Sequence, residues 1–144
     1  MKKNLSKLIL GTELLASLLI LGSIFIWAPV CDGLLTLQNG TMVHMKCFYT
    51  GQVSIVLAII LLFAAIVAFF SKTDHNKLQW VIIVIGIMII ANTFESVIGI
   101  GICKNTAMAC HATSAWLRGS GVLVIISGLF DIFANSSKTN KLTL

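Results

Sequence analysis

Four long apolar runs divide the sequence, and each is close to the length that a helix needs to cross a lipid bilayer. They cover residues 8–28, 52–70, 78–102 and 114–134. About twenty residues of α-helix span the roughly 30 Å of a bilayer's hydrocarbon core. The chain is 58% hydrophobic and 10% charged, whereas soluble domains carry about 25% charged residues. We therefore predict an all-α integral membrane protein, a single domain over residues 1–144 that forms a four-helix bundle.

The first apolar run follows a basic N-terminus, as the hydrophobic region of a cleaved signal peptide would. Such regions are about 7–15 residues long, and the run over residues 8–28 is longer. The sequence Ala28-Pro29-Val30-Cys31 also has no small residue directly before the cysteine. We predict that this run is the first transmembrane helix.

The distribution of basic residues predicts the orientation in the membrane, because cytoplasmic loops carry an excess of lysine and arginine. Two groups flank the apolar runs: Lys2, Lys3, Lys7, Lys72, Lys77, Lys138 and Lys141 on one side, and Lys46, Lys104 and Arg118 on the other. Both termini are therefore predicted in the cytoplasm, with outer loops at residues 31–50 and 103–113. Although the net charge is +5, the basic residues form no cluster, so we expect no nucleic-acid partner.

One short motif occurs twice, each time just before an apolar run. Met45–Gly51 and Met108–Ser114 both read Met-x-Cys-aromatic-x-Thr-small. The repeat indicates two tandem hairpins related by a pseudo-two-fold axis along the membrane normal. The threonines Thr50 and Thr113 are predicted to cap the N-termini of the second and fourth helices.

All four cysteines fall in the predicted outer loops, where disulfides persist. Cys31, Cys47, Cys103 and Cys110 allow three pairings. Pairing within each hairpin, Cys31 with Cys47 and Cys103 with Cys110, is the simplest, while the crossed pairings would tie the hairpins together. One interpretation is purely structural: two disulfides staple the outer loops into a cap. The layout also resembles quinone-linked membrane thiol oxidases, although no Cys-x-x-Cys motif is present.

Softer metal ligands surround these cysteines. His44, Met45, Met108 and His111 would suit Cu(I) if the thiols were free. Thiolate ligation and disulfide formation exclude one another, so we treat the four as weak metal candidates, and the sequence predicts no metal and no cofactor.

Charged residues inside apolar runs are costly and call for a partner. Glu95 and Arg118 fall at similar depths below the outer ends of the third and fourth helices, so we predict a Glu95–Arg118 salt bridge with Asn92 one turn below. The alternative is that each side chain reaches the outer surface separately.

Glu13 and Asp131 fall near the cytoplasmic ends of the first and fourth helices. Either they extend to Lys7 and Lys138, or they face a common polar cavity in which one stays protonated. The second arrangement would suit proton-coupled transport.

The motifs resemble those of a family of small bacterial four-helix membrane proteins of unknown function. Its members carry Met-x-Cys-His-x-Thr-Gly-Gln after the first helix and Cys-x-x-x-x-Met-x-Cys after the third. Phe48 departs from the usual histidine, which weakens a metal role there. The resemblance implies the fold, the disulfides and a multi-pass location in the bacterial cell membrane, and suggests a place beside ABC-type permeases with extracytoplasmic domains. The matching positions are Met45, Cys47, Thr50, Gly51, Gln52, Cys103, Met108 and Cys110.

These observations lead us to expect a non-catalytic accessory or interaction subunit of a larger membrane complex, for which the resemblance suggests an ABC-type exporter. Besides the lipid bilayer, its partner would be another membrane protein or a second copy of the chain. Small residues on the fourth helix, Gly119, Gly121, Ser127 and Gly128, would allow close packing against another helix. The alternatives are a thiol–disulfide oxidoreductase using the outer cysteines and a proton-coupled transporter using Glu13 and Asp131.

Overall fold

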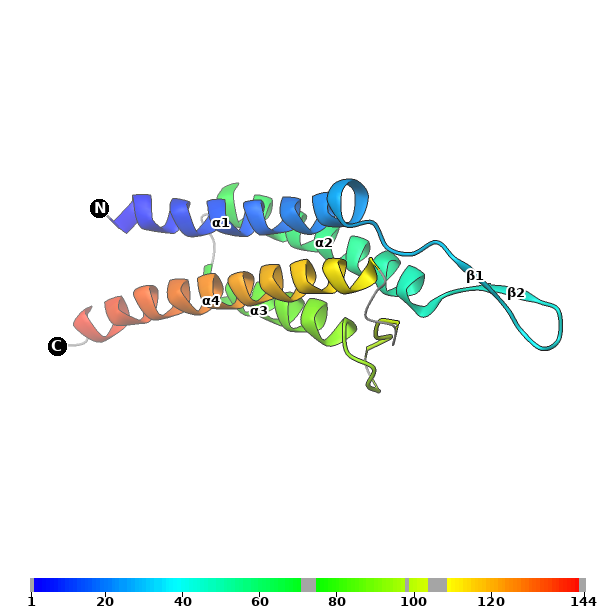
Figure 1. Ribbon diagram of the computed structural model, residues 1–144. Coiled ribbons are helices and arrows are strands. Elements are labelled where there is room, and N and C mark those ends of the chain that lie inside the picture. The colour runs from blue at the N-terminus through cyan, green and yellow to red at the C-terminus, as the bar shows by residue number, and fades with distance from the viewer. Residues whose placement is uncertain (1, 71–74, 98, 104–108, 143–144) are drawn as a thin grey trace.

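The protein is a lengthwise bundle of four helices with a small β-hairpin projecting from one end (Figure 1). The computed structural model describes residues 2–70, 75–97, 99–103 and 109–142. Both ends of the chain lie at one end of the bundle, which we call the proximal end, and the hairpin lies at the other, the distal end. Helix α1 packs against α2 and α4, and α3 packs against the same two helices.

The first predicted helix is present, but it begins six residues earlier than predicted, at Lys2. Helix α1 covers Lys2–Gly22 and continues into a π-helical turn, η1, over Ser23–Trp27. The turn ends with the amide of Ala28 bonded to the carbonyl oxygen of Ser23 at 2.8 Å. Pro29 follows, and because proline disfavours a helical conformation for the residue before it, the helix stops there.

Helices α2 and α4 begin earlier than predicted. Helix α2 covers Lys46–Phe70 and α4 covers Cys110–Leu142, so the repeated motif starts each helix instead of preceding it. Cys47 and Cys110 therefore lie in first helical turns, which fixes the direction of both side chains.

Helix α3 is shorter than predicted, and the expected helix over residues 78–102 is wrong in its second half. The helix covers His75–Asn92, and the chain after it turns back on itself. The glycines explain why: a Cβ at Gly99 would collide with the carbonyl oxygens of Ala91 and Phe94, and Gly101 has a φ of +81°, a conformation that glycine adopts without strain.

The first predicted outer loop contains a hairpin that the sequence analysis missed. Strand β1 covers Leu34–Thr36 and pairs antiparallel with β2, Met42–His44, so that Leu35 lies opposite Val43. Its turn ends at Gly40, whose φ of +75° suits glycine.

The bundle interior is apolar and small residues set its closest contacts. Gly121 on α4 faces α3, where a Cβ would lie 3.1 Å from the carbonyl oxygen of Gly86, and a Cβ on Gly128 would lie 2.7 Å from Ile83. Two of the predicted close-packing glycines thus pack within the chain, while Gly119 has open space around it. The core cluster consists of Ala16, Ile20, Ile24, Leu57, Ala58, Leu61, Ile82, Ile85, Ile89, Leu117 and Val124.

Three helical segments are long and apolar enough to cross a membrane: Lys7–Trp27, Lys46–Phe70 and Cys110–Ala134. The apolar part of α3, Lys77–Asn92, is shorter, and at 1.5 Å per residue it would span roughly 24 Å. The folded-back chain after it contains the buried residues Thr93 and Gly101. Irregular backbone is tolerated at membrane depth where protein covers it.

Candidate functional site

The distal end gathers all four cysteines, although they come from four separate segments. Cys31 follows η1, Cys47 lies in the first turn of α2, Cys103 ends the folded-back chain after α3, and Cys110 begins α4. The Sγ atoms of Cys31, Cys47 and Cys110 lie within 4.8 Å of one another. The Sγ atoms of Cys47 and Cys103 are 3.2 Å apart. We call these four residues the thiol cluster; all four are free thiols in this structure.

The thiol cluster has a buried half and an accessible half. Cys47 and Cys110 are each 1% exposed, whereas Cys31 and Cys103 are partly exposed. The thiol of Cys47 also donates to the carbonyl oxygen of Cys31 at 3.7 Å. A reagent or partner thiol arriving from solvent therefore meets Cys31 or Cys103 first.

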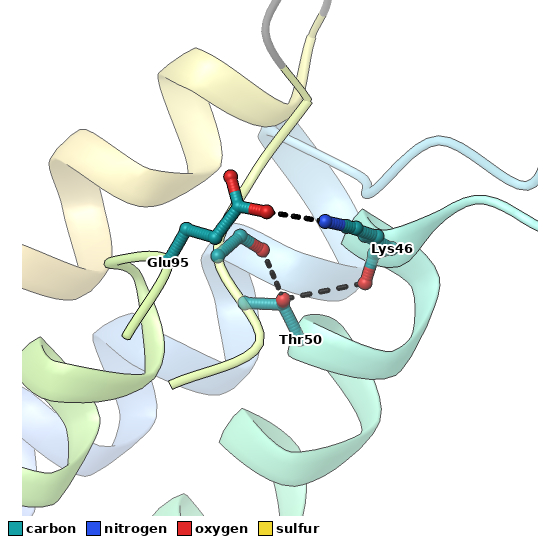
Figure 2. A network of polar contacts seen from close by, with 4 residues as sticks. Lys46, Thr50 and Glu95 are labelled. Atoms are coloured by element: carbon teal, nitrogen blue, oxygen red, sulfur yellow. Dashed lines mark hydrogen bonds and ion pairs between the residues drawn. The ribbon is translucent and has the colours of Figure 1, made fainter. Parts of the chain in front are cut away.

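The motif threonines explain how the cluster is assembled. Thr50, three residues after Cys47, donates its hydroxyl to the carbonyl oxygen of Gly101, just before Cys103 (Figure 2). Thr113, three residues after Cys110, donates to the carbonyl oxygen of Ala28 at 2.6 Å, just before Cys31. Each motif therefore holds the segment that carries a cysteine of the other hairpin.

The prediction that these threonines cap helix N-termini is wrong. Both lie inside their helices because α2 and α4 begin upstream of them. Their hydroxyls also contact the carbonyl oxygens of the preceding turn, Thr50 with Lys46 and Thr113 with Ala109. They act as donors between segments, whereas a capping side chain accepts a bond.

Glu95 and Arg118 have partners other than those predicted. Figure 2 shows the carboxylate of Glu95 on the Lys46 ammonium, in an ion pair near the distal surface. Arg118 donates its Nε–H to the Thr93 hydroxyl at 2.9 Å and lies 4.2 Å from the centre of the Phe94 ring. The early end of α3 is the cause, since it turns Glu95 out of the bundle and brings Thr93 to Arg118.

Asn92 links two helices at the base of the cluster. It is 4% exposed, and its Nδ2 donates to the carbonyl oxygen of Thr50 at 3.0 Å and to the Ser54 hydroxyl at 3.1 Å. In turn, the Asn92 carbonyl oxygen accepts from the Gly101 amide. Asn92 thus bonds to α2 through its side chain and to the folded-back chain through its carbonyl oxygen.

The weak metal candidates around the cluster have other contacts. The His44 ring stacks on Phe48, with centroids 4.2 Å apart, and its Nδ1 lies 3.4 Å from the Asp32 carboxylate. Met45 covers Gly33, and His111 Nε2 lies 3.0 Å from the Cys103 carbonyl oxygen. Met108 falls outside the described residues. If reduced, the cluster's own sulfurs are the atoms here best suited to a soft metal ion.

Glu13 and Asp131 are far from the thiol cluster, in the proximal half of the bundle. Both are buried, and both oxygens of Glu13 lack a hydrogen-bond partner. The predicted contact of Glu13 with Lys7 is therefore not formed, while Lys138 lies outside the residues whose side chains are described. Sequence reasoning missed Gln79, which is fully buried on α3; its place two residues after Lys77, at the start of an apolar run, was the available signal.

The sequence was compared with known protein families. A family model described as a domain of unknown function, DUF4418, matches residues 13–134. The chain belongs to the DUF4418 family. The matched part of this DUF4418 chain includes the whole thiol cluster as well as Glu13, Gln79 and Asp131. No curated protein and no solved structure matches the chain significantly.

Proposed function

We propose that this protein is a non-catalytic accessory subunit of a larger complex in the bacterial cell membrane, and that its distal hairpin docks on the extracytoplasmic part of a partner. The positive-inside distribution supports cytoplasmic termini, which would place the hairpin outside. An ABC-type exporter with an extracytoplasmic domain is the partner class that the family resemblance suggests. The observation that carries the proposal is the hairpin's apolar surface.

Both faces of the hairpin carry exposed apolar side chains, although Thr36 and His44 share the face of Leu34 and Met42. Because side chains alternate along a strand, Leu34 and Met42 lie on one face, and Leu35 and Val43 lie on the other. All four are exposed, from 39% for Val43 to 68% for Met42. An isolated two-stranded hairpin is at best marginally stable in water, and contiguous exposed apolar surface marks an interaction site. A partner surface that covers both faces would stabilise the hairpin and bury its exposed apolar side chains.

The thiol cluster supports a rigid base for this hairpin. Cys31 precedes β1 and Cys47 follows β2, so disulfides in the cluster would fix both ends of the hairpin to the bundle. The 3.2 Å contact between Cys47 and Cys103 favours the crossed pairing, with Cys31 and Cys110 as the second pair. Such bridges constrain the unfolded chain and hold the docking surface in place.

Site-specific photo-crosslinking in native membranes tests the docking role. A photoreactive phenylalanine at Leu35 and at Met42 samples both faces of the hairpin, and the same residue at Phe63, which is exposed on α2, is the matched control. We expect both hairpin positions to yield an adduct with one membrane protein that Phe63 does not yield. Adducts with lipid alone, or only with a second copy of this chain, would overturn the proposal.

The second candidate is a membrane thiol–disulfide oxidoreductase, and the convergence of four sulfurs favours it. In that reaction the Cys103 thiolate would attack a partner's disulfide, which forms a mixed disulfide and releases one partner thiol. The Cys47 thiolate would then attack the Cys103 sulfur, which forms a Cys47–Cys103 disulfide and releases the second partner thiol. Cys47→Ser should accordingly accumulate a mixed disulfide at Cys103 after acid trapping, whereas Ser54→Ala should not. Absence of any mixed disulfide in Cys47→Ser would remove this candidate.

A further inference from the structure

Three buried polar side chains from three helices lie in the proximal half of the bundle. Glu13 on α1 and Gln79 on α3 are fully buried, and Asp131 on α4 is 5% exposed. Thr12 and Phe130, the neighbours of Glu13 and Asp131, line one groove between α1 and α4. Gln79 Oε1 would lie 3.5 Å from a Cβ on Gly128, which is one turn before Asp131 on α4. Glu13 lies six residues beyond Lys7, where the apolar segment begins, or about 9 Å along the helix axis.

Two of these side chains lack the hydrogen bonds that buried polar groups normally make. Neither oxygen of Glu13 has a partner, nor do Nε2 and Oε1 of Gln79. Gln79 Oε1 faces α4 beside Gly128, so an unsatisfied amide and an unsatisfied carboxyl group are both buried in the proximal half. Buried polar groups are almost always bonded, so each exception calls for an explanation.

The surroundings of Glu13 disfavour its charged form. On α1, Lys7 is exposed, and among the described residues no lysine, arginine or histidine forms an ion pair with Glu13. The proximal half of α2, residues 59–70, is entirely apolar. On α3 and α4, Lys77 and Asp131 each interact with a further group. A charge without an opposite partner is costly to bury in apolar surroundings, so a carboxyl group placed there is more stable uncharged.

We propose that Glu13, Gln79 and Asp131 form an intramembrane proton-binding site in which Glu13 carries the proton. A protonated Glu13 has no charge and gains an O–H donor, which can bond to Gln79 Oε1 or to the Asp131 carboxylate. The Gln79 Nε2–H can then donate to the remaining Glu13 oxygen, so a single proton satisfies the atoms that this structure leaves without partners. Exchange with solvent would take place at the proximal end, where α1, α3 and α4 are closest to the aqueous phase.

The donor set suits a proton better than a metal cation. Magnesium and calcium take six or more oxygen ligands. Glu13, Gln79 and Asp131 offer fewer oxygens, and one end of the Gln79 amide is a donor that cannot ligate a cation.

Labelling with dicyclohexylcarbodiimide tests the site. This lipid-soluble reagent modifies protonated carboxyl groups in apolar surroundings, and peptide mass analysis locates the adduct. In proteoliposomes at about pH 8 we expect Glu13 to react faster than the exposed Glu95 by about an order of magnitude. Equal labelling of the two from about pH 5 to about pH 9, or protection of Glu13 by sodium but not by choline, would overturn the proposal.

Variants of the neighbours separate a specific site from simple burial. Asp131→Asn removes the charge that favours protonation of Glu13, so the labelling of Glu13 should fall off at lower pH than in the wild type. Thr12→Val, beside Glu13 in sequence, is the matched control and should leave the pH profile unchanged. Identical profiles in the wild type and Asp131→Asn would contradict a coupled site, and Glu13→Gln should abolish labelling of that peptide.

Discussion

Two sets of polar side chains, one at each end of the bundle, differ in their hydrogen bonding. At the distal end the buried Thr113 and Asn92 and the half-buried Arg118 each bond to another segment of the chain. In the proximal half Glu13 and Gln79 are equally buried but have no hydrogen-bond partner. Bonded polar groups fix one arrangement, whereas unsatisfied ones leave a choice of protonation state. The bonded side chains hold the distal end in one arrangement, and the unsatisfied atoms of Glu13 and Gln79 are those on which the proposed proton site rests.

The largest expected effect is the loss of the cysteine bridges. If the thiol cluster is oxidised as Cys47–Cys103 and Cys31–Cys110, reduction should lower the free energy of unfolding by about 4 kcal/mol for each bridge, because the first joins residues 56 positions apart. Unfolding in detergent, with and without reductant, measures the change.

Peptide mapping of the same protein checks the pairing. Alkylation without reduction should modify none of the four cysteines, and proteolysis should yield the two crossed peptides. If all four cysteines are alkylated in protein taken from membranes under acid trapping, the distal end is not held by disulfides and the comparison between the two ends weakens.

Removing either of the crossed threonine hydrogen bonds should lower the free energy of unfolding by a smaller amount. Thr113→Val keeps the shape of the side chain but removes the bond to Ala28, which leaves a buried carbonyl oxygen without that donor and should cost about 1–3 kcal/mol. Thr50→Val should cost a similar amount if the two hairpins are equivalent. The matched control is Thr12→Val, whose hydroxyl bonds to the carbonyl oxygen of Ile9 in its own helix. Equal unfolding midpoints for Thr113→Val and Thr12→Val would show that the crossed bonds do not hold the distal end together.

The helices were predictable because hydrophobic run length is a strong and local signal. Runs near residues 8–28, 52–70 and 114–134 all correspond to helices in the structure. The end of α3 was not predictable in this way, because residues 93–102 continue the apolar run that begins in the helix. The structure shows why the chain turns back, since Gly99 lies very close to the backbone of Ala91.

The residues of the candidate sites could be predicted from the sequence, but the segments that they contact could not. The repeat pointed to Cys47, Thr50, Cys110 and Thr113, yet the crossed contacts depend on which segments the folded chain brings together. Gln79 gave no comparable signal, because a single glutamine beside an interfacial Trp80 is as easily explained by solvation at the end of a helix. Only its complete burial shows otherwise.

The pH dependence of stability gives a sharper view of the proximal half. If the folded protein holds a proton on Glu13 that the unfolded chain releases, stability should fall as pH rises above the range where an exposed glutamate ionises, by at most about 1.4 kcal/mol per pH unit. Glu13→Gln cannot ionise and should flatten this slope. Glu95→Gln, at an exposed carboxylate, serves as the control and should leave the slope in place. A wild-type slope unchanged in Glu13→Gln would assign the pH dependence to another group.

The smallest effect is expected from the most visible ion pair of the distal end. Lys46 and Glu95 are in direct contact, but their side chains are 60% and 55% exposed, so solvent screens their attraction. Exposed pairs contribute about 0–1 kcal/mol, and Glu95→Gln should change the unfolding midpoint less than Thr50→Val, although both residues meet the first turn of α2. A double-mutant cycle with Lys46→Gln isolates the pair, and its coupling energy should shrink further at high salt. A coupling energy larger than the effect of Thr50→Val would mean that charge, and not the buried crossed bonds, organises the distal end.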